Sequence, residues 1–487
     1  MFLTSIESGD SMKIEMKNLG PVKSAFIDER DLTVIVGDNG SGKTLLLEAK
    51  TFILNYYRKN MYEFIRELNK KYADDLELET DWSNIIKFID DLSFSKNDDE
   101  IKRFDFDVEI KVENYVREKI NNEIKTYFDS LKQETINELN KEILMVNESN
   151  FDFNLFMNNP SIPLISTLNC TLIIFDEKIA FLEIGNDDNE EHKQVMEMFR
   201  ITIDSPPGNL VLDNSTDAET LKEKKQLYDP LNDMKSKIKY TAIADLFRGI
   251  THIGEILYLP SERNLFMDDA LTKTLKESYN SRYSFARENS KIRYSEFLFN
   301  LAYLNYKDRL NRFHREDLKV NPVLEKMFGG KIIYDEEGDI KSIHKNDGTK
   351  IKRELFSTKQ NRLIPYLILN TPFQQYNKLI IEEPEAHLSL KSIRELLGYF
   401  KLLIKKGIKV TITTHSDVFF THLNNLILKD KDLDTQVYEL KFYGDQSILE
   451  DKTKTETGYE IDLFTKELNN LYEDTLSIQE NIEQTEE

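Results

Sequence analysis

The sequence predicts an α/β fold whose central sheet is assembled from segments at the two ends of the chain. Near the start, an apolar run at 32–36 leads into a glycine-rich stretch at 37–44, and a helical pattern follows. In the last third, helical and strand patterns alternate from 360 to 413. This alternation is typical of a doubly wound parallel sheet. Because the N-terminus adds two short strands joined by a turn, the complete sheet is expected to be mixed.

Residues 1–54 are expected to form the N-terminal part of this domain. Alternating polar and apolar residues indicate strands at 13–17 and 22–27, which a Gly-Pro turn separates. The run at 32–36 predicts a third strand that is buried. Behind the glycines, apolar residues recur at helical spacing from Leu45 onward, so a helix is expected to begin there.

Residues 55–240 are expected to be an insertion that combines a helical arm with a β-hairpin. The helical part shows one apolar stripe, formed by Val112, Val116, Ile120, Ile124, Phe128 and Leu131. A helix that packs lengthwise on the same domain is an equally good interpretation, because the heptads are too few for a long coiled coil. The hairpin is predicted at 170–175 and 179–184, and the charged stretches at 185–192 and 213–239 are expected to be loops.

Residues 241–450 are expected to form the C-terminal part of the domain, and residues 451–487 an acidic tail. A glycine pair introduces a predicted hairpin at 331–334 and 340–344. The remaining expected elements are strands at 256–259, 378–381, 408–413 and 436–442 and helices at 360–369 and 388–404.

Composition restricts the function classes. The 487 residues carry a net charge of −22, so contact with nucleic acid would require a local Lys/Arg patch. Cys170 is the only cysteine, which excludes an intramolecular disulfide and a cysteine-rich zinc site. The chain contains no apolar run of membrane-spanning length and no signal peptide pattern. We therefore expect a cytoplasmic protein that does not bind a membrane.

The strongest motif predicts a nucleotide-binding loop. Its spacing, G-x-x-x-x-G-K-[ST], lies between a buried strand and a helix. Glycines allow successive backbone N–H groups to point at phosphates, and the helix N-terminus favours negative charge. ATP is the expected ligand, with Lys43 on the β- and γ-phosphates and Thr44 on Mg²⁺. The expected binding residues are Gly37, Asp38, Asn39, Gly40, Ser41, Gly42, Lys43 and Thr44.

A second segment, LIIEEPEAH, places acids at the end of an apolar strand. In a nucleotide-binding α/β fold, this is where a carboxylate meets the metal and a second one activates water. We expect Glu382 to face Mg²⁺ and Glu383 to act as the catalytic base. The alternative is an ordinary helix N-terminus, where acids also accumulate.

Two further segments are weaker when taken alone. His415 follows the apolar strand at 408–413 and is expected to sense the γ-phosphate, although an isolated histidine is more often structural. Ser357 directly precedes a helix, and from position alone a helix cap is its simplest interpretation.

Taken together, the segments resemble the ABC-type ATPases of the SMC, RecF and overcoming-lysogenization-defect class. The resemblance rests on GDNGSGKT, YLPSER, LFSTKQ, LIIEEPEAH and TITTHSD, which occur in this order within 13–54 and 241–440. It implies an ABC-type head in which two copies pair face to face. Ser357, Lys359 and Gln360 would then contact the ATP of the partner. Lys359 stands where the class normally has glycine, and Glu382 replaces the more usual aspartate.

Within this class, the sequence looks most similar to stand-alone ATPases of bacterial anti-phage systems of the PARIS and Septu types. This resemblance implies a sensor or scaffold ATPase whose dimer, or higher oligomer, controls a separately encoded effector such as a nuclease or toxin. DNA or a phage protein is the implied trigger. The alternative is a DNA-repair or chromosome-maintenance ATPase that binds a duplex. No second acidic cluster supports a nuclease within this chain.

Overall fold

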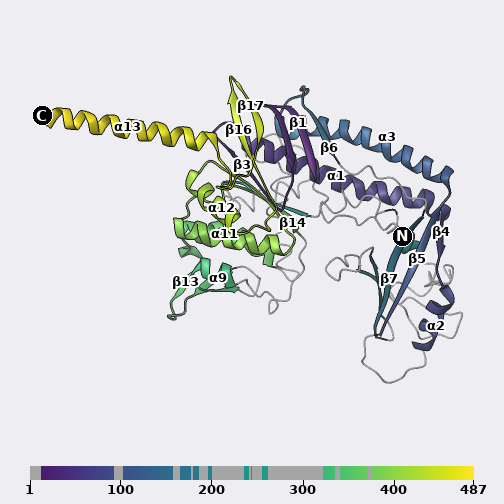
Figure 1. Ribbon diagram of the computed structural model, residues 1–487. Coiled ribbons are helices and arrows are strands. Elements are labelled where there is room, and N and C mark those ends of the chain that lie inside the picture. The colour runs from purple at the N-terminus through teal and green to yellow at the C-terminus, as the bar shows by residue number, and fades with distance from the viewer. Residues whose placement is uncertain are drawn as a thin grey trace, which may run out of the picture. The chain divides into compact units, whose positions relative to one another are not determined.

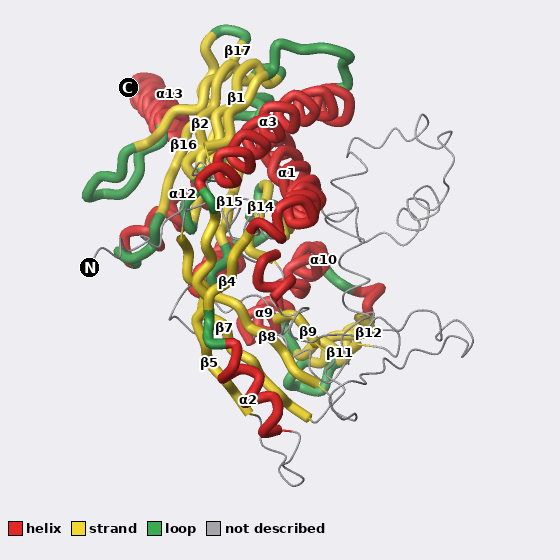
Figure 2. The backbone as a smooth tube through the Cα atoms, turned by 90° about the vertical axis from the view of Figure 1, so that its right-hand side faces the viewer, coloured by secondary structure: helices red, strands yellow, loops and turns green. Residues whose placement is uncertain are grey.

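The computed structural model describes residues 12–92, 102–156, 165–176, 179–185, 196–199, 235–240, 243, 255–261, 322–334, 340–370 and 376–486. The chain divides into two compact units. The head unit comprises residues up to 58, residues 131–157 and residues from 252 onward. The inserted unit comprises 59–130 and 158–251. Figures 1 and 2 show the elements in two views.

The head unit contains a nine-stranded mixed sheet, which confirms the predicted α/β fold. From β10 to β16 the neighbouring strands are parallel, and the other half contains antiparallel pairs. The strand order is β10 (Glu255–Leu259), β14 (Tyr376–Glu382), β15 (Lys409–Thr414), β3 (Leu32–Gly37), β16 (Thr435–Tyr443), β17 (Gln446–Lys452), β2 (Val22–Asp28), β1 (Lys13–Leu19), β6 (Asp152–Phe156). The two ends of the chain therefore meet in one sheet, as the sequence predicts.

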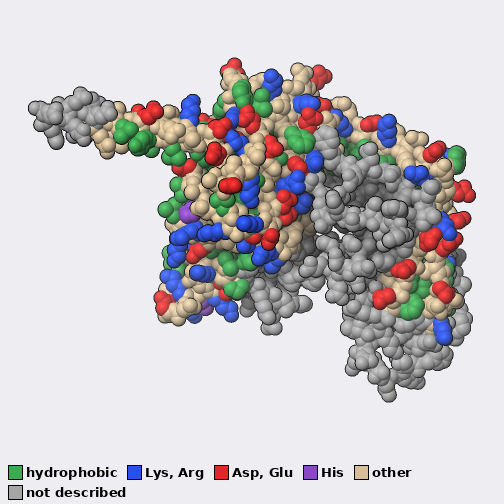
Figure 3. Space-filling view, in the orientation of Figure 1, with side chains coloured by type: hydrophobic (Ala, Val, Ile, Leu, Met, Phe, Trp, Pro, Cys, Tyr) green, Lys and Arg blue, Asp and Glu red, His purple; other side chains and the backbone are tan. Residues whose placement is uncertain are grey.

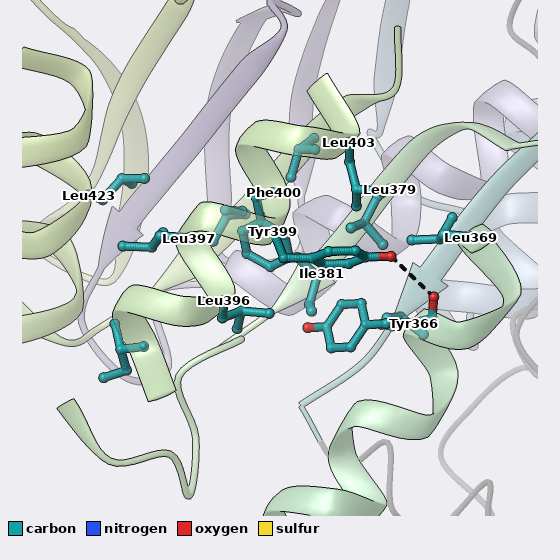
Figure 4. Close-up of a cluster of buried hydrophobic side chains, with 14 of the residues drawn as sticks. Tyr366, Leu369, Leu379, Ile381, Leu396, Leu397, Tyr399, Phe400, Leu403 and Leu423 are labelled. Atoms are coloured by element: carbon teal, nitrogen blue, oxygen red, sulfur yellow. Dashed lines mark hydrogen bonds between the residues drawn. The ribbon is translucent and has the colours of Figure 1, made fainter. Parts of the chain in front are cut away.

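Helices of the head unit build the hydrophobic core against the parallel strands. In Figure 4, Leu396, Phe400 and Leu403 of α11 (Leu390–Lys405) face Leu379 and Ile381 of β14. The Tyr399 hydroxyl, on the same helix, donates a hydrogen bond of 3.3 Å to the Tyr366 carbonyl. Among the described residues, the α-helices of this unit are α9 (Pro322–Phe328), α10 (Thr358–Leu363), α11 (Leu390–Lys405), α12 (Asp417–Lys429), α13 (Asp462–Glu486), the start of α1 (Lys43–Tyr72) and the end of α3 (Asn114–Leu139).

A buried charge cluster connects the N-terminal and C-terminal segments of the sheet. Glu29 follows β2, and its Oε1 atom accepts a 2.8 Å hydrogen bond from Lys50 Nζ on α1. Its other oxygen accepts a hydrogen bond from Lys378 on β14. Lys50 also donates to Thr411 Oγ1 on β15 at 3.1 Å. All four side chains are buried, so these bonds form in a medium of low polarity.

A small antiparallel sheet belongs to the head unit and confirms the hairpin predicted behind the glycine pair. Its strands are β11 (Lys331–Tyr334), β12 (Ile340–His344) and β13 (Lys350–Lys352). Ile332, Ile343 and Ile351 lie opposite one another in register. Ile332 and Ile343 belong to the hydrophobic core, and Ile351 packs against it.

The inserted unit contains more β-structure than the sequence predicts. The hairpin of β7 (Ile165–Asp176) and β8 (Ile179–Gly185) is confirmed. It lies in a five-stranded sheet with β4 (Leu76–Glu79), β5 (Lys102–Val112) and β9 (Met196–Phe199). Apolar and charged residues alternate in all three strands, as in half-buried strands, but the high charge of this region favoured the interpretation as a helical arm. Helix α2 (Trp82–Leu92) follows β4.

Helix α3 (Asn114–Leu139) packs lengthwise on α1 in the inserted unit. Tyr127 of α3 stacks on Phe64 of α1 with ring centroids 3.7 Å apart. The Tyr127 hydroxyl also donates to the Asn60 carbonyl at 3.0 Å. Most of the predicted apolar stripe is buried, but Val112 belongs to β5 instead of the helix.

Two expectations for the C-terminal part are corrected. The helix expected at 360–369 begins at Thr358 and continues as a 3₁₀ helix from Ile364 to Asn370. Pro365 explains the change, because proline lacks the N–H that an α-helical hydrogen bond needs. The segment expected as an acidic tail contains the end of β17 and the 25-residue helix α13. In the part of the chain described here, no helix has the length and apolar character needed to cross a bilayer.

Candidate functional site

The glycine-rich loop leaves the carboxyl end of β3, which is buried along its whole length between β15 and β16. Helix α1 begins at Lys43, so the loop lies at the N-terminus of a 30-residue helix. Gly40 and Gly42 have φ angles of 77° and 99°. At Gly42 an added Cβ would also lie 2.7 Å from Val22 Cγ2. The backbone shape of the loop therefore requires glycine at this position.

Lys43 folds back over the loop. Its Nζ atom donates to the Gly37 carbonyl at 2.8 Å and to the Asp38 carbonyl at 2.7 Å. The side chain is buried, and burial lowers the pKa of Lys43 because it disfavours the charged form. The two hydrogen bonds to the loop carbonyls hold the ammonium group at the mouth of the loop.

Carboxylates surround this ammonium group. Those of Glu383, Asp38, Glu382 and Glu385 act on Lys43 electrostatically and oppose the lowering of its pKa. One lysine among four carboxylates does not neutralise a triphosphate. The charges of the site therefore favour a nucleotide that arrives with a divalent cation.

Glu382 ends β14 and contacts the first turn of α1. Its Oε2 atom accepts hydrogen bonds from Thr44 Oγ1 at 3.2 Å and from the Ser261 N–H at 3.4 Å. Its Oε1 atom accepts a hydrogen bond from the Tyr258 hydroxyl. Burial raises the pKa of Glu382, and the hydrogen bond from Tyr258 opposes this shift.

Glu383 and His415 form a pair at the ends of neighbouring strands. Glu383 Oε1 lies 3.0 Å from His415 Nδ1. The Glu383 N–H donates to the Thr413 carbonyl at 2.9 Å, and its φ of 42° is unusual for a residue other than glycine. Strained backbone of this kind is common at functional sites, where the surrounding structure enforces it.

Glu385 is a residue of this site for which the sequence analysis assigned no role. It is buried, and its Oε1 atom accepts a 2.5 Å hydrogen bond from Thr414 Oγ1. Its Oε2 atom has no hydrogen-bond partner among the described residues. Burial raises the pKa of Glu385. Tyr258 and Ser261 were likewise noted only as part of the YLPSER segment, and no local pattern links them to Glu382.

Ser357, Lys359 and Gln360 are engaged in local contacts. Ser357 caps α10, and its hydroxyl accepts from the Gln360 N–H at 3.3 Å. Gln360 completes a capping box by accepting from the Ser357 N–H at 2.9 Å. Lys359 pairs with Glu395 at 3.7 Å. Within the described residues, no hydrogen bond or ion pair joins these three side chains to the glycine-rich loop.

A hollow of about 270 Å³ lies between the loop and helix α13. On the loop side, its lining includes Asp38, His415 and Asp417. On the helix side, its lining includes Leu463, Phe464, Glu467, Leu468 and Leu471. The start of α13 is therefore next to the expected position of the nucleotide, which the sequence analysis did not anticipate.

A buried central strand, a glycine-rich loop at a helix N-terminus and carboxylates at the end of a neighbouring parallel strand define a P-loop nucleotide-binding protein. A family model described as "AAA ATPase domain" matches residues 12–420. The chain belongs to this family of ATPases. No curated protein matches the sequence.

Solved structures similar to this chain include heads of SMC proteins. One is an Smc head bound to the C-winged helix domain of ScpA, with 13% identity, 90% coverage of this chain, 96% coverage of that chain and a TM-score of 0.32. A second is an Smc head with an extended coiled coil bound to the C-terminal domain of ScpA from Pyrococcus furiosus. It has 13% sequence identity, 95% coverage of this chain, 98% coverage of that chain and a TM-score of 0.32. The SMC head domain from Thermotoga maritima has 11% sequence identity, 91% coverage of this chain, 98% coverage of that chain and a TM-score of 0.29.

Proposed function

We propose that the protein is a Mg²⁺-dependent ATP hydrolase. The observation that supports this function is the convergence of Lys43, Thr44, Glu382, Glu383 and His415 from three separate chain segments onto one edge of the sheet. In this proposal, Lys43 leaves its loop carbonyls to bind the β- and γ-phosphates, as P-loop lysines do. Glu383 accepts the proton of the attacking water, and His415 orients the Glu383 carboxylate through their contact.

The donor atoms at Thr44 and Glu382 fit Mg²⁺. One hydroxyl and one carboxylate oxygen, already in contact at 3.2 Å, are the hard oxygen ligands that this ion prefers. Among the described residues, no group of three or more His, Cys, Asp or Glu side chains could hold a metal alone. Phosphate oxygens and waters would therefore complete the coordination. When bound, Mg²⁺ supplies the positive charge that the acidic site lacks.

The experiment combines two variants that separate binding from chemistry. Lys43→Ala should abolish ATP binding in calorimetry, because it removes the cation that meets the phosphates. Glu383→Gln should retain ATP binding but lower the hydrolysis rate by about a hundredfold or more, because the amide does not accept the proton. The exposed Glu354→Gln variant is the matched control and should hydrolyse ATP at the wild-type rate. Wild-type hydrolysis by Glu383→Gln would show that another group is the base.

We further propose that hydrolysis takes place between two copies, with Ser357 of one copy facing the γ-phosphate on the other. Ser357 is exposed and free to meet a second chain with its cap intact. Ser357→Asp separates the two roles, because aspartate caps a helix as well as serine but repels phosphate. We expect normal thermal stability, normal ATP binding and loss of ATP-dependent dimerisation, whereas the neutral cap Ser357→Asn should retain the dimer. Dimerisation of Ser357→Asp at the wild-type affinity would refute the contact.

Mixing variants tests the shared site in a second way. Ser357→Arg should block closure of two heads while each loop still binds ATP. Mixed with Lys43→Ala, it gives heterodimers in which one site carries both defects and the other site carries neither. Part of the activity should return. If differentially tagged heterodimers form and recover no activity at any mixing ratio, each site lies within one chain.

In the cell, we propose that the ATP-bound dimer controls a separately encoded effector in anti-phage defence. The support is the resemblance of the five segments to stand-alone defence ATPases. The test is co-purification with the products of neighbouring genes, using Glu383→Gln to retain ATP and Lys43→Ala to exclude it. An effector should co-elute with only one of the two nucleotide states. Equal co-elution with both variants would contradict control by ATP.

A second candidate function, binding to duplex DNA, is favoured by the small sheet of the head unit. Its register places Lys331, His344 and Lys350 in one row across three strands, with Lys352 two residues further along the same face. The three lysines are exposed, and no carboxylate of the described residues lies within ion-pair distance of them. Basic side chains gather on this part of the surface in Figure 3. In a chain of net charge −22, such a local patch is the feature that DNA contact requires.

Salt dependence tests this second function. Lys331→Ala combined with Lys350→Ala should weaken duplex binding and lower the slope of log K against log salt by about two. Lys70→Ala combined with Lys125→Ala is the control, since both lysines are exposed and belong to the inserted unit. Equal effects of the two pairs would indicate non-specific attraction instead of binding by the small sheet.

A further inference from the structure

Helix α13 carries an apolar stripe with alternating spacings of four and three residues. The stripe consists of Phe464, Leu468, Leu471, Thr475, Ile478 and Ile482. This spacing corresponds to the d and a positions of a heptad repeat. Leu468, Leu471 and Ile478 are 52%, 63% and 58% exposed, and hydrophobic side chains are visible along the helix in Figure 3. Scattered exposed leucines need no explanation, but a continuous stripe on one helix face indicates a partner.

Among the described residues, the packing of α13 against the rest of the head unit is confined to the beginning of the helix. The Phe464 ring lies 5.9 Å from that of Phe420. The buried Glu439 accepts hydrogen bonds from the N–H groups of Asp462 at 3.1 Å and Leu463 at 2.8 Å, which caps the helix. From Thr465 to residue 479 every side chain is exposed. The stripe therefore starts at an anchored turn and continues without cover.

We propose that the stripe of α13 pairs in parallel with the α13 stripe of a second copy of this chain. The charges beside the stripe favour this occupant. The e positions Thr465, Tyr472 and Gln479 are uncharged and only Glu486 at the end of the helix is acidic, whereas the g positions are Glu467, Asp474 and Asn481. In a parallel pair, each g residue faces an e residue of the partner, so acids meet neutral side chains. In an antiparallel pair the g acids would face one another and repel.

Thr475 is compatible with burial in such a seam. It occupies an a position, and its hydroxyl already donates to the Leu471 carbonyl at 2.8 Å within the same helix. Pairing therefore leaves no unsatisfied donor at this position. Glu473 occupies an f position and would face solvent. The inference goes beyond the proposed function and does not depend on it, because it requires no nucleotide.

Cysteine cross-linking of the full-length protein tests both the pairing and its direction. The background is Cys170→Ala, since Cys170 is the only cysteine. In a parallel pair, Leu471→Cys and Ile478→Cys should each form a disulfide with the same position of the second copy. The f-position control Glu473→Cys should not, because its Cβ atoms are too far apart for a disulfide. A disulfide between Leu468→Cys and Ile478→Cys that forms only in a mixture of the two variants would show an antiparallel pair, because an a position then lies opposite a d position. Equal yields at 471 and 473 would show random collision. Either result overturns the proposal.

Association without nucleotide provides the second measurement. Leu468→Glu combined with Leu471→Glu should raise the dimer dissociation constant in sedimentation by about tenfold or more. Asn469→Glu combined with Asn470→Glu adds the same charge at b and c positions and should leave association unchanged. Circular dichroism should show the same unfolding curve for both pairs, because all four side chains are exposed. Equal dissociation constants for the two variants, or a wild type that stays monomeric and uncross-linked, would refute the pairing.

Discussion

Glu29→Gln should destabilise the head unit far more than Lys378→Met, although both changes remove one charge from the same buried cluster. Glu29 is the one carboxylate that the structure shows between the ammonium groups of Lys50 and Lys378. Its removal leaves two buried cations without a counter-charge. Breaking a buried ion pair from one side costs about 3–5 kcal/mol, and we expect a loss of this size.

Lys378→Met leaves a balanced pair of Glu29 and Lys50. It removes one hydrogen bond to Glu29, which costs about 1–3 kcal/mol. It also relieves the burial of a second ammonium group, an effect that opposes the loss. We therefore expect a net cost below about 2 kcal/mol. The order of the two variants, rather than either value, is the prediction.

Urea denaturation followed by circular dichroism measures both variants. The exposed Glu354→Gln change is the control and should stay within about 0.5 kcal/mol of the wild type. The denaturant slopes should agree, because the surface exposed on unfolding is the same. If Lys378→Met proved as destabilising as Glu29→Gln, the excess of positive charge would not govern the energetics of the cluster.

The cluster also predicts a pH dependence. Burial lowers the pKa of Lys378 to about 8, whereas a lysine in an unfolded chain has a pKa of 10.5. Between these values the unfolded chain binds more protons, so the stability contributed by Lys378 rises as pH rises through this window. The wild type should therefore gain stability relative to Lys378→Met between pH 8 and pH 10.5. A constant difference would show that Lys378 does not lose its proton in the folded state.

Three further predictions concern the nucleotide site. Gly42→Ala should weaken ATP binding in calorimetry by about tenfold or more, because the added Cβ would clash with Val22. Gly40→Ala should lose less ATP affinity, because its added Cβ would have no atom within 4 Å. Equal losses would contradict the steric argument. Thr44→Val should bind nucleotide like the wild type in EDTA, but added Mg²⁺ should not raise its affinity. A rise in affinity equal to that of the wild type would show that Thr44 is not a Mg²⁺ ligand. Tyr258→Phe removes a hydrogen bond that lowers the pKa of Glu382. The acidic side of the pH dependence of the hydrolysis rate should therefore move to higher pH. If it does not move, the titration of Glu382 does not set the pH dependence of the rate.

The segments that carry chemistry are readable in the sequence because each is short and local. The loop from Gly37 to Thr44 has a spacing that only a strand-to-helix turn satisfies, and the acids at Glu382 and Glu383 interrupt an apolar strand. The end of a parallel strand is a defined place in an α/β sheet. Their approach to one another could therefore be predicted, and the contact between Thr44 and Glu382 agrees with it.

Contacts between distant segments could not be predicted in this way. Tyr258 and Ser261 reach Glu382 only because β10 pairs with β14, a register that neither strand encodes alone. The cluster of Glu29, Lys50 and Lys378 depends likewise on the order of the sheet. Strand pairing is selected by the sum of many weak long-range contacts, which no single segment of the sequence reveals.

Helix α13 shows how composition can conceal a local pattern. The sequence by itself determines its alternating spacing, but the acidic average of residues 451–487 led to the expectation of a tail. Only the tertiary structure decides which of its apolar residues are covered. Phe464 packs against Phe420, whereas Leu468 and Leu471 remain exposed. The sequence determines which residues can form a buried face, and the fold decides which of them are buried, because burial depends on what lies opposite.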